Sequence, residues 1–263
     1  MFRPIAVFCF TLIWGINLSL NSWAQVGDLT YVHGGIIRGD QRHPRIALVF
    51  TAHEYAEGGE IILESLQDEG AKASFFFTGA FYRRADAVPL IQKIQGQGHY
   101  LGAHSDQHLL YCDWKDRQRL LVDKATFTKD VVDNYLEMQK FGISQQEAEY
   151  FLPPYEWYND SISRWAGDLG LTLVNFSPGT RSNADYTTPE MPNYVDSESI
   201  FKQILAYEEQ DPNGLNGFIL LLHLGVGPKR SDKFHRLLPD LLRTLSERNY
   251  SFVRIDELLE HTP

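Results

Sequence analysis

The sequence predicts an α/β fold, namely a distorted, incomplete (β/α)7-type barrel. Short apolar runs, typical of strands buried on both faces, recur along the chain. Longer helix-like segments lie between them, and repeated βα units of this size give parallel strands joined by helical crossovers. Seven such strands suit a barrel-like closure. In a barrel of this kind the chemistry belongs at the carboxyl ends of the strands.

Each expected element follows from its local pattern. The expected strands cover residues 45–50, 73–77, 99–103, 149–152, 171–176, 217–222 and 251–254. The expected helices cover residues 59–69, 87–97, 115–139, 161–168, 197–208 and 233–247. The first helix carries Ile62 and Leu66 on one face and stops at Gly70, a residue that favours helix ends. The second tolerates Pro89 in its first turn. The third is amphipathic, with Leu121, Ala125, Val132 and Leu136 near helical spacing.

The first residues have the pattern of a secretory signal peptide that is cleaved after Ala24. Arg3 supplies a positive start, residues 5–20 are almost wholly apolar, and Ser22 and Ala24 are small. A transmembrane anchor is the alternative, but the apolar core is short for a span of ~20 residues. We therefore expect residues 25–263 to form a single exported domain, periplasmic or extracellular in a bacterium, with no membrane span after cleavage.

Composition excludes several classes of protein. The 263 residues include 24 Lys and Arg against 34 Asp and Glu, which gives a net charge of −10. Such an acidic chain is a poor nucleic-acid binder, because affinity for phosphates comes from Lys and Arg. The hydrophobic share of 43% excludes a disordered acidic tail.

Four of the expected strands run directly into titratable side chains. The residues at these strand ends are His53, Glu54, His104, His108, Glu156 and His223. The barrel brings such ends to one rim. His104 and His108 are four residues apart, so a helical turn after the strand would place both on one face, where they can share one metal ion.

The order of these motifs resembles the NodB-homology polysaccharide deacetylases, a family of carbohydrate esterases, over residues 45–259. The segment 70–79 is similar to part of the family's opening unit. The segment 104–108 matches its His-Ser-x-x-His motif, and 153–155 matches the end of its Arg-Pro-Pro-Tyr motif. His223 ends a match to the late Leu-x-x-His motif. The resemblance implies a distorted barrel.

The resemblance also implies roles for individual residues. His104 and His108 would be metal ligands, the Tyr155 amide would help bind the oxyanion, and His223 would act as general acid. Two departures stand out. The family's first motif, Thr-Phe-Asp-Asp-Gly, supplies a base and a metal ligand, but Thr51 and Ala52 occupy those positions here. The Arg that orients the base is Leu152.

We expect the loop after the first strand, together with Glu156, to supply the metal ligand and the base that are missing from these positions. His53 is assigned to the metal ion, expected to be zinc, and Glu54 to the catalytic base. Glu156, which replaces the small residue usual after that Tyr, is a further catalytic candidate. In the alternative assignment Glu54 binds the metal and His53 is the base.

The function that follows is a metal-dependent hydrolase removing acetyl groups, N- or O-linked, from a polysaccharide or oligosaccharide. The bond cleaved is then a non-peptide C–N bond or an ester bond. Exposed aromatics such as Tyr111, Trp114, Trp157 and Tyr158 are candidates for stacking on sugar faces. The alternative is a catalytically silent glycan-binding module of the same fold, favoured by the missing Asp pair. An amidase or esterase acting on a non-sugar substrate is a third possibility, because the fold does not fix the substrate.

Overall fold

The computed structural model describes residues 24–26 and 28–260. The predicted signal peptide lies outside these residues except for Ala24. The strands are β1 (Ala24–Val26), β2 (Leu29–Val32), β3 (Gly35–Arg38), β4 (Arg45–Ala52), β5 (Ser74–Phe77), β6 (Tyr100–Ala103), β7 (Tyr150–Phe151), β8 (Thr172–Leu173), β9 (Phe218–His223) and β10 (Ser251–Val253). The helices are α1 (Gly59–Asp68), α2 (Gly79–Tyr82), α3 (Val88–Gly96), α4 (Lys124–Gln139), α5 (Asp160–Asp168), α6 (Ser197–Gln210), α7 (Leu238–Glu247) and α8 (Ile255–Leu259).

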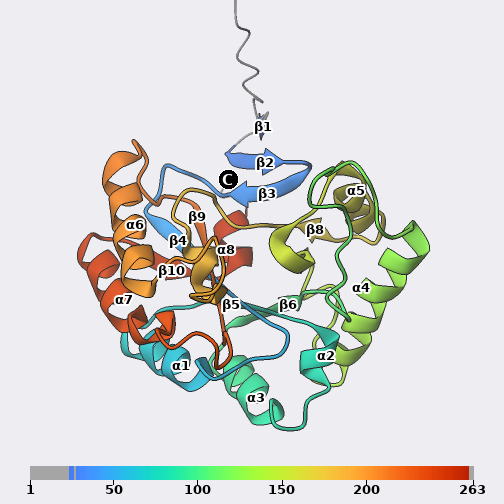
Figure 1. The fold of residues 1–263 in the computed structure, drawn as a ribbon, viewed down its shortest axis with the longest axis horizontal. Coiled ribbons are helices and arrows are strands. Elements are labelled where there is room, and N and C mark those ends of the chain that lie inside the picture. The colour runs from blue at the N-terminus through green and yellow to red at the C-terminus, as the bar shows by residue number, and fades with distance from the viewer. Residues whose placement is uncertain (1–23, 27, 261–263) are drawn as a thin grey trace, which may run out of the picture.

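These strands form one curled sheet, which confirms the distorted, incomplete barrel. Its order is β1-β2-β3-β9-β4-β5-β6-β7-β8, with β10 also paired to β4. Strands β4 to β10 pair in parallel, whereas β1, β2 and β3 add an antiparallel edge next to β9. A bridge between Ile36 of β3 and Val174, the residue after β8, links the far end of the sheet to its antiparallel part. Figure 1 shows the helices arranged around the outside of these strands.

Strand β4 lies at the centre of the fold because it pairs with β5, β9 and β10. All of its residues except Arg45 are buried, as expected for a strand covered on both faces. Thr51 aligns with Phe76 of β5 and with His223 of β9. The parallel register therefore delivers the carboxyl ends of these strands to the same edge.

The expected parallel strands and most helices are present, but the helix after β6 differs from the prediction. It begins at Lys124 instead of residue 115, with Asp123 accepting a hydrogen bond from the Thr126 N–H as its N-cap. Its predicted apolar face is also wrong, because Leu121, Val132 and Leu136 are exposed. The buried side of α4 includes the polar residues Asp130 and Asn134.

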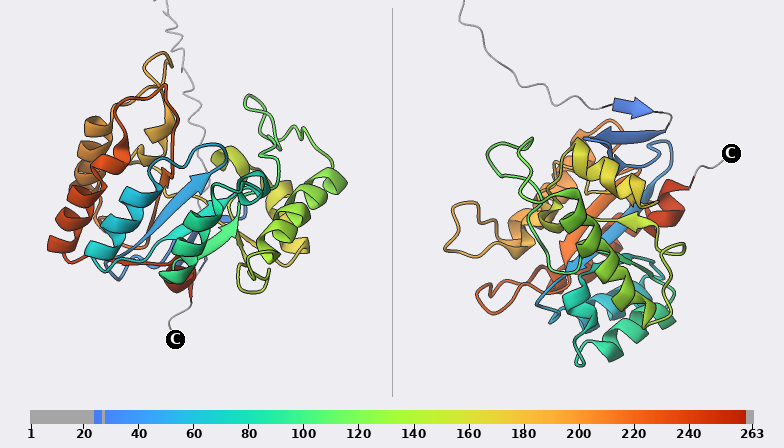
Figure 2. Two further views of the ribbon diagram at one scale, coloured as in Figure 1. Left: turned by 90° about the horizontal axis from the view of Figure 1, so that it is seen from below. Right: turned by 90° about the vertical axis from the view of Figure 1, so that its right-hand side faces the viewer.

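Two long loops rise above the strand ends on either side, over residues 104–123 and 174–196 (Figure 2). The sequence did not indicate two short 3-10 segments, Pro154–Glu156 after β7 and Ser182–Tyr186 within the second of these loops. Across residues 24–26 and 28–260, none of the helices is long and apolar enough to cross a membrane.

Candidate active site

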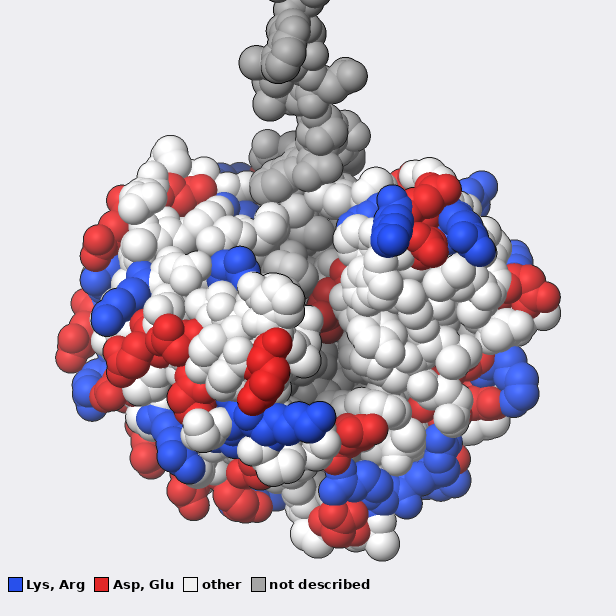
Figure 3. All heavy atoms as spheres, in the orientation of Figure 1, with Lys and Arg blue, Asp and Glu red and all other residues white. Residues whose placement is uncertain are grey.

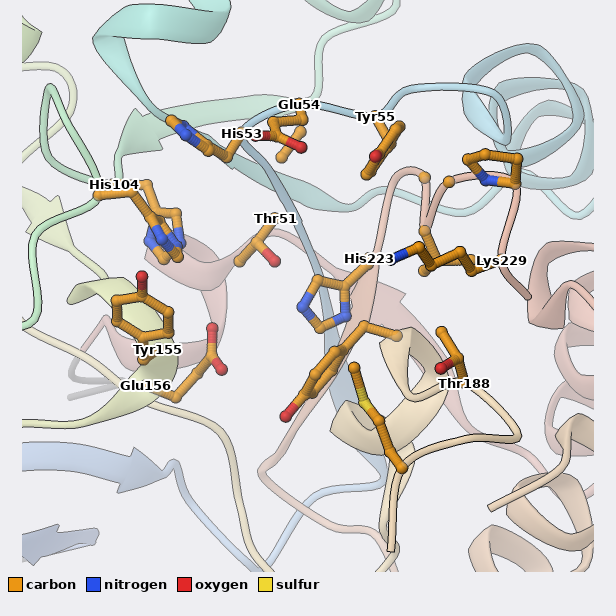
Figure 4. Close-up of a pocket in the computed structure, with 18 of the residues that line it drawn as sticks. Thr51, His53, Glu54, Tyr55, His104, Tyr155, Glu156, Thr188, His223 and Lys229 are labelled. Carbon is orange, nitrogen blue, oxygen red and sulfur yellow. The ribbon is translucent and has the colours of Figure 1, made fainter. Parts of the chain in front are cut away.

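A cavity of about 520 Å³ opens at the carboxyl ends of β4, β6 and β9. All six of the titratable residues predicted at strand ends line it, together with Tyr155 (Figure 4). The structure thus brings together residues that are up to 170 positions apart in the chain, from His53 to His223. In Figure 3 this face is hollowed between two lobes whose nearest surface is mostly uncharged.

His104 and His108 form one wall of the pocket. The Nε2 atoms of the two rings lie 3.2 Å apart. The Nδ1 atom of His104 donates a hydrogen bond of 2.8 Å to the carbonyl of Leu152. This bond fixes the ring and leaves its Nε2 lone pair directed at His108. The Leu that replaces the family's Arg therefore contributes a backbone contact to this wall.

Both imidazoles are neutral at physiological pH. Burial, countered only in part by the bond to Leu152, lowers the pKa of His104 to about 3. Burial and the neighbouring His104 and His53 rings lower the pKa of His108 to about 2. Neutral imidazole is the form that binds metal ions.

Polar groups of α4 hold the segment that carries this pair. Asn134 accepts a hydrogen bond from the His104 N–H at 2.8 Å. Asp130 accepts bonds from the N–H groups of Asp106 and Gln107, at 3.1 and 2.8 Å. Asp130 and Asn134 lie on the inward face of α4, among the buried Phe127, Val131, Tyr135 and Met138, because they satisfy the backbone of the turn after β6.

His53 lies beside this pair at the end of β4. Its ring stacks on that of His108, with 5.0 Å between centroids and 18° between planes. Its Nδ1 atom lies 3.1 Å from the Thr78 hydroxyl, which also caps α2 by accepting the Phe81 N–H. The Nε2 atom, on the other edge of the ring, is left for a ligand.

The histidines fit a metal ion in part. Two imidazoles bound to one tetrahedral zinc at about 2.0–2.1 Å would have their nitrogens about 3.3 Å apart, close to the 3.2 Å seen here. The His53 ring stacks on that of His108 instead of converging with the pair on one point. Among the described residues, no group of three or more His, Cys, Asp or Glu side chains is arranged to hold a metal ion.

His223 forms the opposite wall. Its Nδ1 atom lies 2.6 Å from Oδ1 of Asp185, and its backbone N–H donates to Oδ2 of the same carboxylate at 2.8 Å. Burial lowers the pKa of His223, but Asp185 and Glu156 together raise it above its ordinary value. Sequence reasoning missed Asp185, which comes from the short segment Ser182–Tyr186, where no local pattern marks it.

Tyr155 and Glu156 occupy a strained turn at the pocket floor. Both have left-handed φ angles, of 59° and 53°, which are costly for residues other than glycine. The Tyr155 ring packs on His108 with 4.3 Å between centroids. The Tyr155 N–H donates no hydrogen bond within the part of the chain that the structure describes.

The carboxylates of the pocket follow the strands and do not belong to them. Thr51 and Ala52, the last residues of β4, are buried and line the pocket without any acidic group. Glu54 is exposed beside His53. Glu156 directs its carboxyl group inwards (Figure 4), and burial raises its pKa to about 7, with His223 opposing and Asp185 adding to the shift.

Exposed apolar side chains surround the opening. Of the four aromatic residues predicted to face sugar, Tyr111 and Tyr158 are buried in the core, so for these the prediction is wrong. Trp114 is 54% exposed and lines the pocket, and Trp157 packs against it. The exposed large apolar residues of the pocket are Tyr55, Trp114, Tyr155, Tyr186 and Met191.

Comparisons with known proteins agree with this architecture. A family model described as polysaccharide deacetylase matches residues 38–174. The peptidoglycan-N-acetylmuramic acid deacetylase PdaA of Bacillus subtilis is 23% identical over 252 residues, which cover 94% of this chain and 85% of that protein.

Solved structures show the same fold. The Bc1960 peptidoglycan N-acetylglucosamine deacetylase superposes with a TM-score of 0.66 at 17% identity, covering 86% of this chain and 92% of that one. BA3943 of Bacillus anthracis, described as a CE4 family pseudoenzyme, gives a TM-score of 0.67 at 17% identity, covering 88% of this chain and 70% of that one.

Proposed function

This chain belongs to the polysaccharide deacetylase family, and from that premise we propose that it is a metal-dependent hydrolase that removes acetyl groups from a glycan. The observation that carries the proposal is the pocket itself. In it the neutral pair His104 and His108 faces a third histidine, His223, which is paired with a carboxylate. We also infer that residues 25–263 act as one domain, because a single sheet draws strands from the whole described chain.

The proposed reaction is the hydrolysis of an acetyl amide or ester. Water adds its oxygen to the acetyl carbon, the C–N or C–O bond breaks, and acetate leaves together with a free amine or hydroxyl. His104, His108 and His53 are the residues proposed to hold a divalent ion, zinc in our assignment, which when bound supplies carbonyl polarisation and acidification of water.

The remaining steps belong to the chain's own groups. Glu54 is the proposed base that takes the proton of the water, with Glu156 as the second candidate for this role. The free Tyr155 N–H supports the negative oxygen of the tetrahedral intermediate. His223, which Asp185 holds and whose pKa it raises, donates a proton to the departing nitrogen or oxygen.

We propose an acetylated glycan as the substrate because exposed aromatic side chains surround the pocket opening. Exposed aromatic faces around a pocket suit the apolar faces of sugar rings. The peptidoglycan named for the relative PdaA lies outside the cytoplasm, as would this protein if the predicted signal peptide is cleaved. We therefore propose a periplasmic or extracellular location with a cell-wall glycan as the first substrate to test.

The second candidate function is a silent glycan-binding module. The specific observation in its favour is that Thr51 and Ala52 bring no carboxylate to the pocket. The His223–Asp185 pair argues against a silent module, because glycan binding alone does not require a general acid.

Acetate release separates the two candidates. Purified protein is incubated with peptidoglycan glycan strands, chitin oligosaccharides and an aryl acetate, with chelator and after zinc is restored. The proposal expects release that stops with chelator, returns with zinc and falls about 10²–10⁴-fold in His223→Ala. Glycan binding without release from any substrate by the zinc-loaded protein would establish the silent module instead.

A further inference from the structure

The pocket has one permanently cationic side chain. Of the described residues that line it, Lys229 is the only Lys or Arg. Figure 4 shows this side chain reaching from the loop after β9 towards His223, with its nitrogen on the pocket side. Glu54 and Glu156 lie towards the other wall, whereas the His223 side holds Lys229 beside the His223–Asp185 pair.

The ammonium of Lys229 has no partner of its own within residues 24–26 and 28–260. It forms neither a hydrogen bond nor an ion pair there, whereas the next two cations of the loop are occupied. Lys233 pairs with Glu57 at 2.6 Å. Arg230 is wholly buried and donates to the Thr187 carbonyl at 2.7 Å and to the Ser197 hydroxyl at 2.9 Å.

Lys229 does act weakly on one neighbouring acid. The pKa of Glu190 is lowered first by its hydrogen bond with Thr188 and least by the charge of Lys229. Glu190 therefore does not neutralise the ammonium, which stays available to a ligand in the pocket.

The backbone under Lys229 is anchored on both sides. Glu57 accepts hydrogen bonds from the N–H groups of Val226 and Gly227, at 3.0 and 2.8 Å. On the other side, the buried guanidinium of Arg230 ties the loop to the segment that contains Asp185 and Tyr186. Lys229 thus differs from an ordinary surface lysine, because its Cα position is fixed at the pocket mouth even though its side chain is exposed.

We propose that Lys229 binds a carboxylate carried by the substrate, so that the preferred glycan is an acidic acylated sugar. This inference rests on the proposed deacetylase function for the acyl group and adds the charge of the sugar. An ammonium and a carboxylate form a charge-assisted hydrogen bond. A substrate bound the other way round would place its carboxylate near Glu54, which would repel it. The carboxylate is therefore directed to the His223 side.

Two kinds of sugar carry such a group. In one the carboxylate belongs to the ring, as in an N-acetylhexosaminuronic acid. In the other it sits on an ether substituent, as in N-acetylmuramic acid. N-acetylglucosamine has neither and is otherwise closely similar, so the three sugars form a matched set.

The test is equilibrium binding by calorimetry at low salt, with disaccharides that contain each of the three sugars. The variants are Lys229→Met, Lys229→Arg and, as a control on the outer face of α6, Lys202→Met. We expect wild type to bind at least one acidic sugar about tenfold more tightly than the neutral one. This preference should vanish in Lys229→Met, survive in Lys229→Arg and Lys202→Met, and shrink in 0.5 M salt. The sugar that shows it identifies the position of the carboxylate.

Equal binding of acidic and neutral sugars by wild type overturns the proposal, as does a preference that Lys229→Met retains. An equal fall in turnover on all three sugars in Lys229→Met, without a change in binding, assigns Lys229 to the reaction and also overturns it. The deacetylase function fails separately, if acidic sugars bind preferentially but release no acetate.

Discussion

The two walls of the pocket use the same residue type with opposite electrostatics. His104 and His223 are both held close to the cavity, and burial lowers the pKa of each. His104 donates its Nδ1 proton to a backbone carbonyl, and its pKa falls to about 3. His223 faces the Asp185 carboxylate, and its pKa rises. The partner of Nδ1 therefore decides in which direction the pKa of a buried histidine moves.

This difference separates two chemical tasks. A neutral imidazole with a free Nε2 lone pair is a ligand, whereas an imidazolium held by a carboxylate is a proton donor. Each task would fail with the other wall's electrostatics, because a protonated nitrogen cannot bind a cation and a histidine with a pKa of about 3 carries no proton at neutral pH. The predictions below test this contrast.

The largest effect is expected on metal content. A variant with both His104→Ala and His108→Ala should lose the ion that we propose for the wild type, from about one per chain to none, because two of its three ligands are removed. The measurement is elemental analysis after dialysis against zinc. His43→Ala, which removes an exposed histidine outside the pocket, is the matched control and should keep its zinc. A full zinc content in the double variant would show that His104 and His108 do not bind the metal ion.

On the other wall, Asp185→Asn should lower turnover by about 10³–10⁴-fold at unchanged zinc content. Without the carboxylate, burial dominates and the pKa of His223 falls below its ordinary value. Activity that needs protonated His223 declines as pH rises through this pKa, so the alkaline limb of the pH–rate profile should move to lower pH. NMR titration of the His223 ring gives the same pKa directly. An unmoved limb would mean that His223 is not the acid.

The sequence allowed the His104 wall to be predicted better than the His223 wall. His104 and His108 lie four residues apart after a buried strand, so a local pattern marked them. Asp185 lies 38 residues before its partner, in a 3-10 segment that β9 meets only in the folded chain. Spacing along the chain carries no information about such a pair.

The helix α4 shows where periodicity misled the prediction. Its apolar residues Val132 and Leu136 repeat at helical spacing, yet they face solvent. Asn134 and Asp130 face inwards because the backbone of residues 104–107 needs acceptors. The inward face still buries Phe127, Val131, Tyr135 and Met138, so α4 keeps its apolar contact with the core although Val132 and Leu136 are exposed. Each buried N–H left without an acceptor would cost about 1–3 kcal/mol.

The roles of the two pocket carboxylates, Glu54 and Glu156, could not be assigned from spacing along the chain. Glu54→Gln should keep its zinc and lower turnover by about 10²–10³-fold, because an amide cannot take the proton of water. Glu156→Gln is the matched variant inside the same pocket. If Glu156 is the base instead, Glu156→Gln should show the larger loss of turnover. The acid limb of the pH–rate profile near pH 7 should then be absent in that variant. Loss of zinc in Glu54→Gln, with zinc retained in His53→Ala, would exchange the roles of those two residues.

The smallest expected effect is on stability, and it should have opposite signs on the two walls of the metal-free protein. The folded pKa of His104 lies below the unfolded value of about 6.5, so its contribution is present above pH 6.5 and is lost as pH falls. Between pH 8 and pH 5 the loss is about 2 kcal/mol. The folded pKa of His223 is raised, so its contribution is present at acid pH and is lost as pH rises through that value. Urea unfolding at the two pH values measures both. His104→Gln should lose less stability than wild type on acidification, and His223→Gln should lose more. A shift in the same direction in both variants would show that the two histidines share one charge state, and the contrast between the walls would fail.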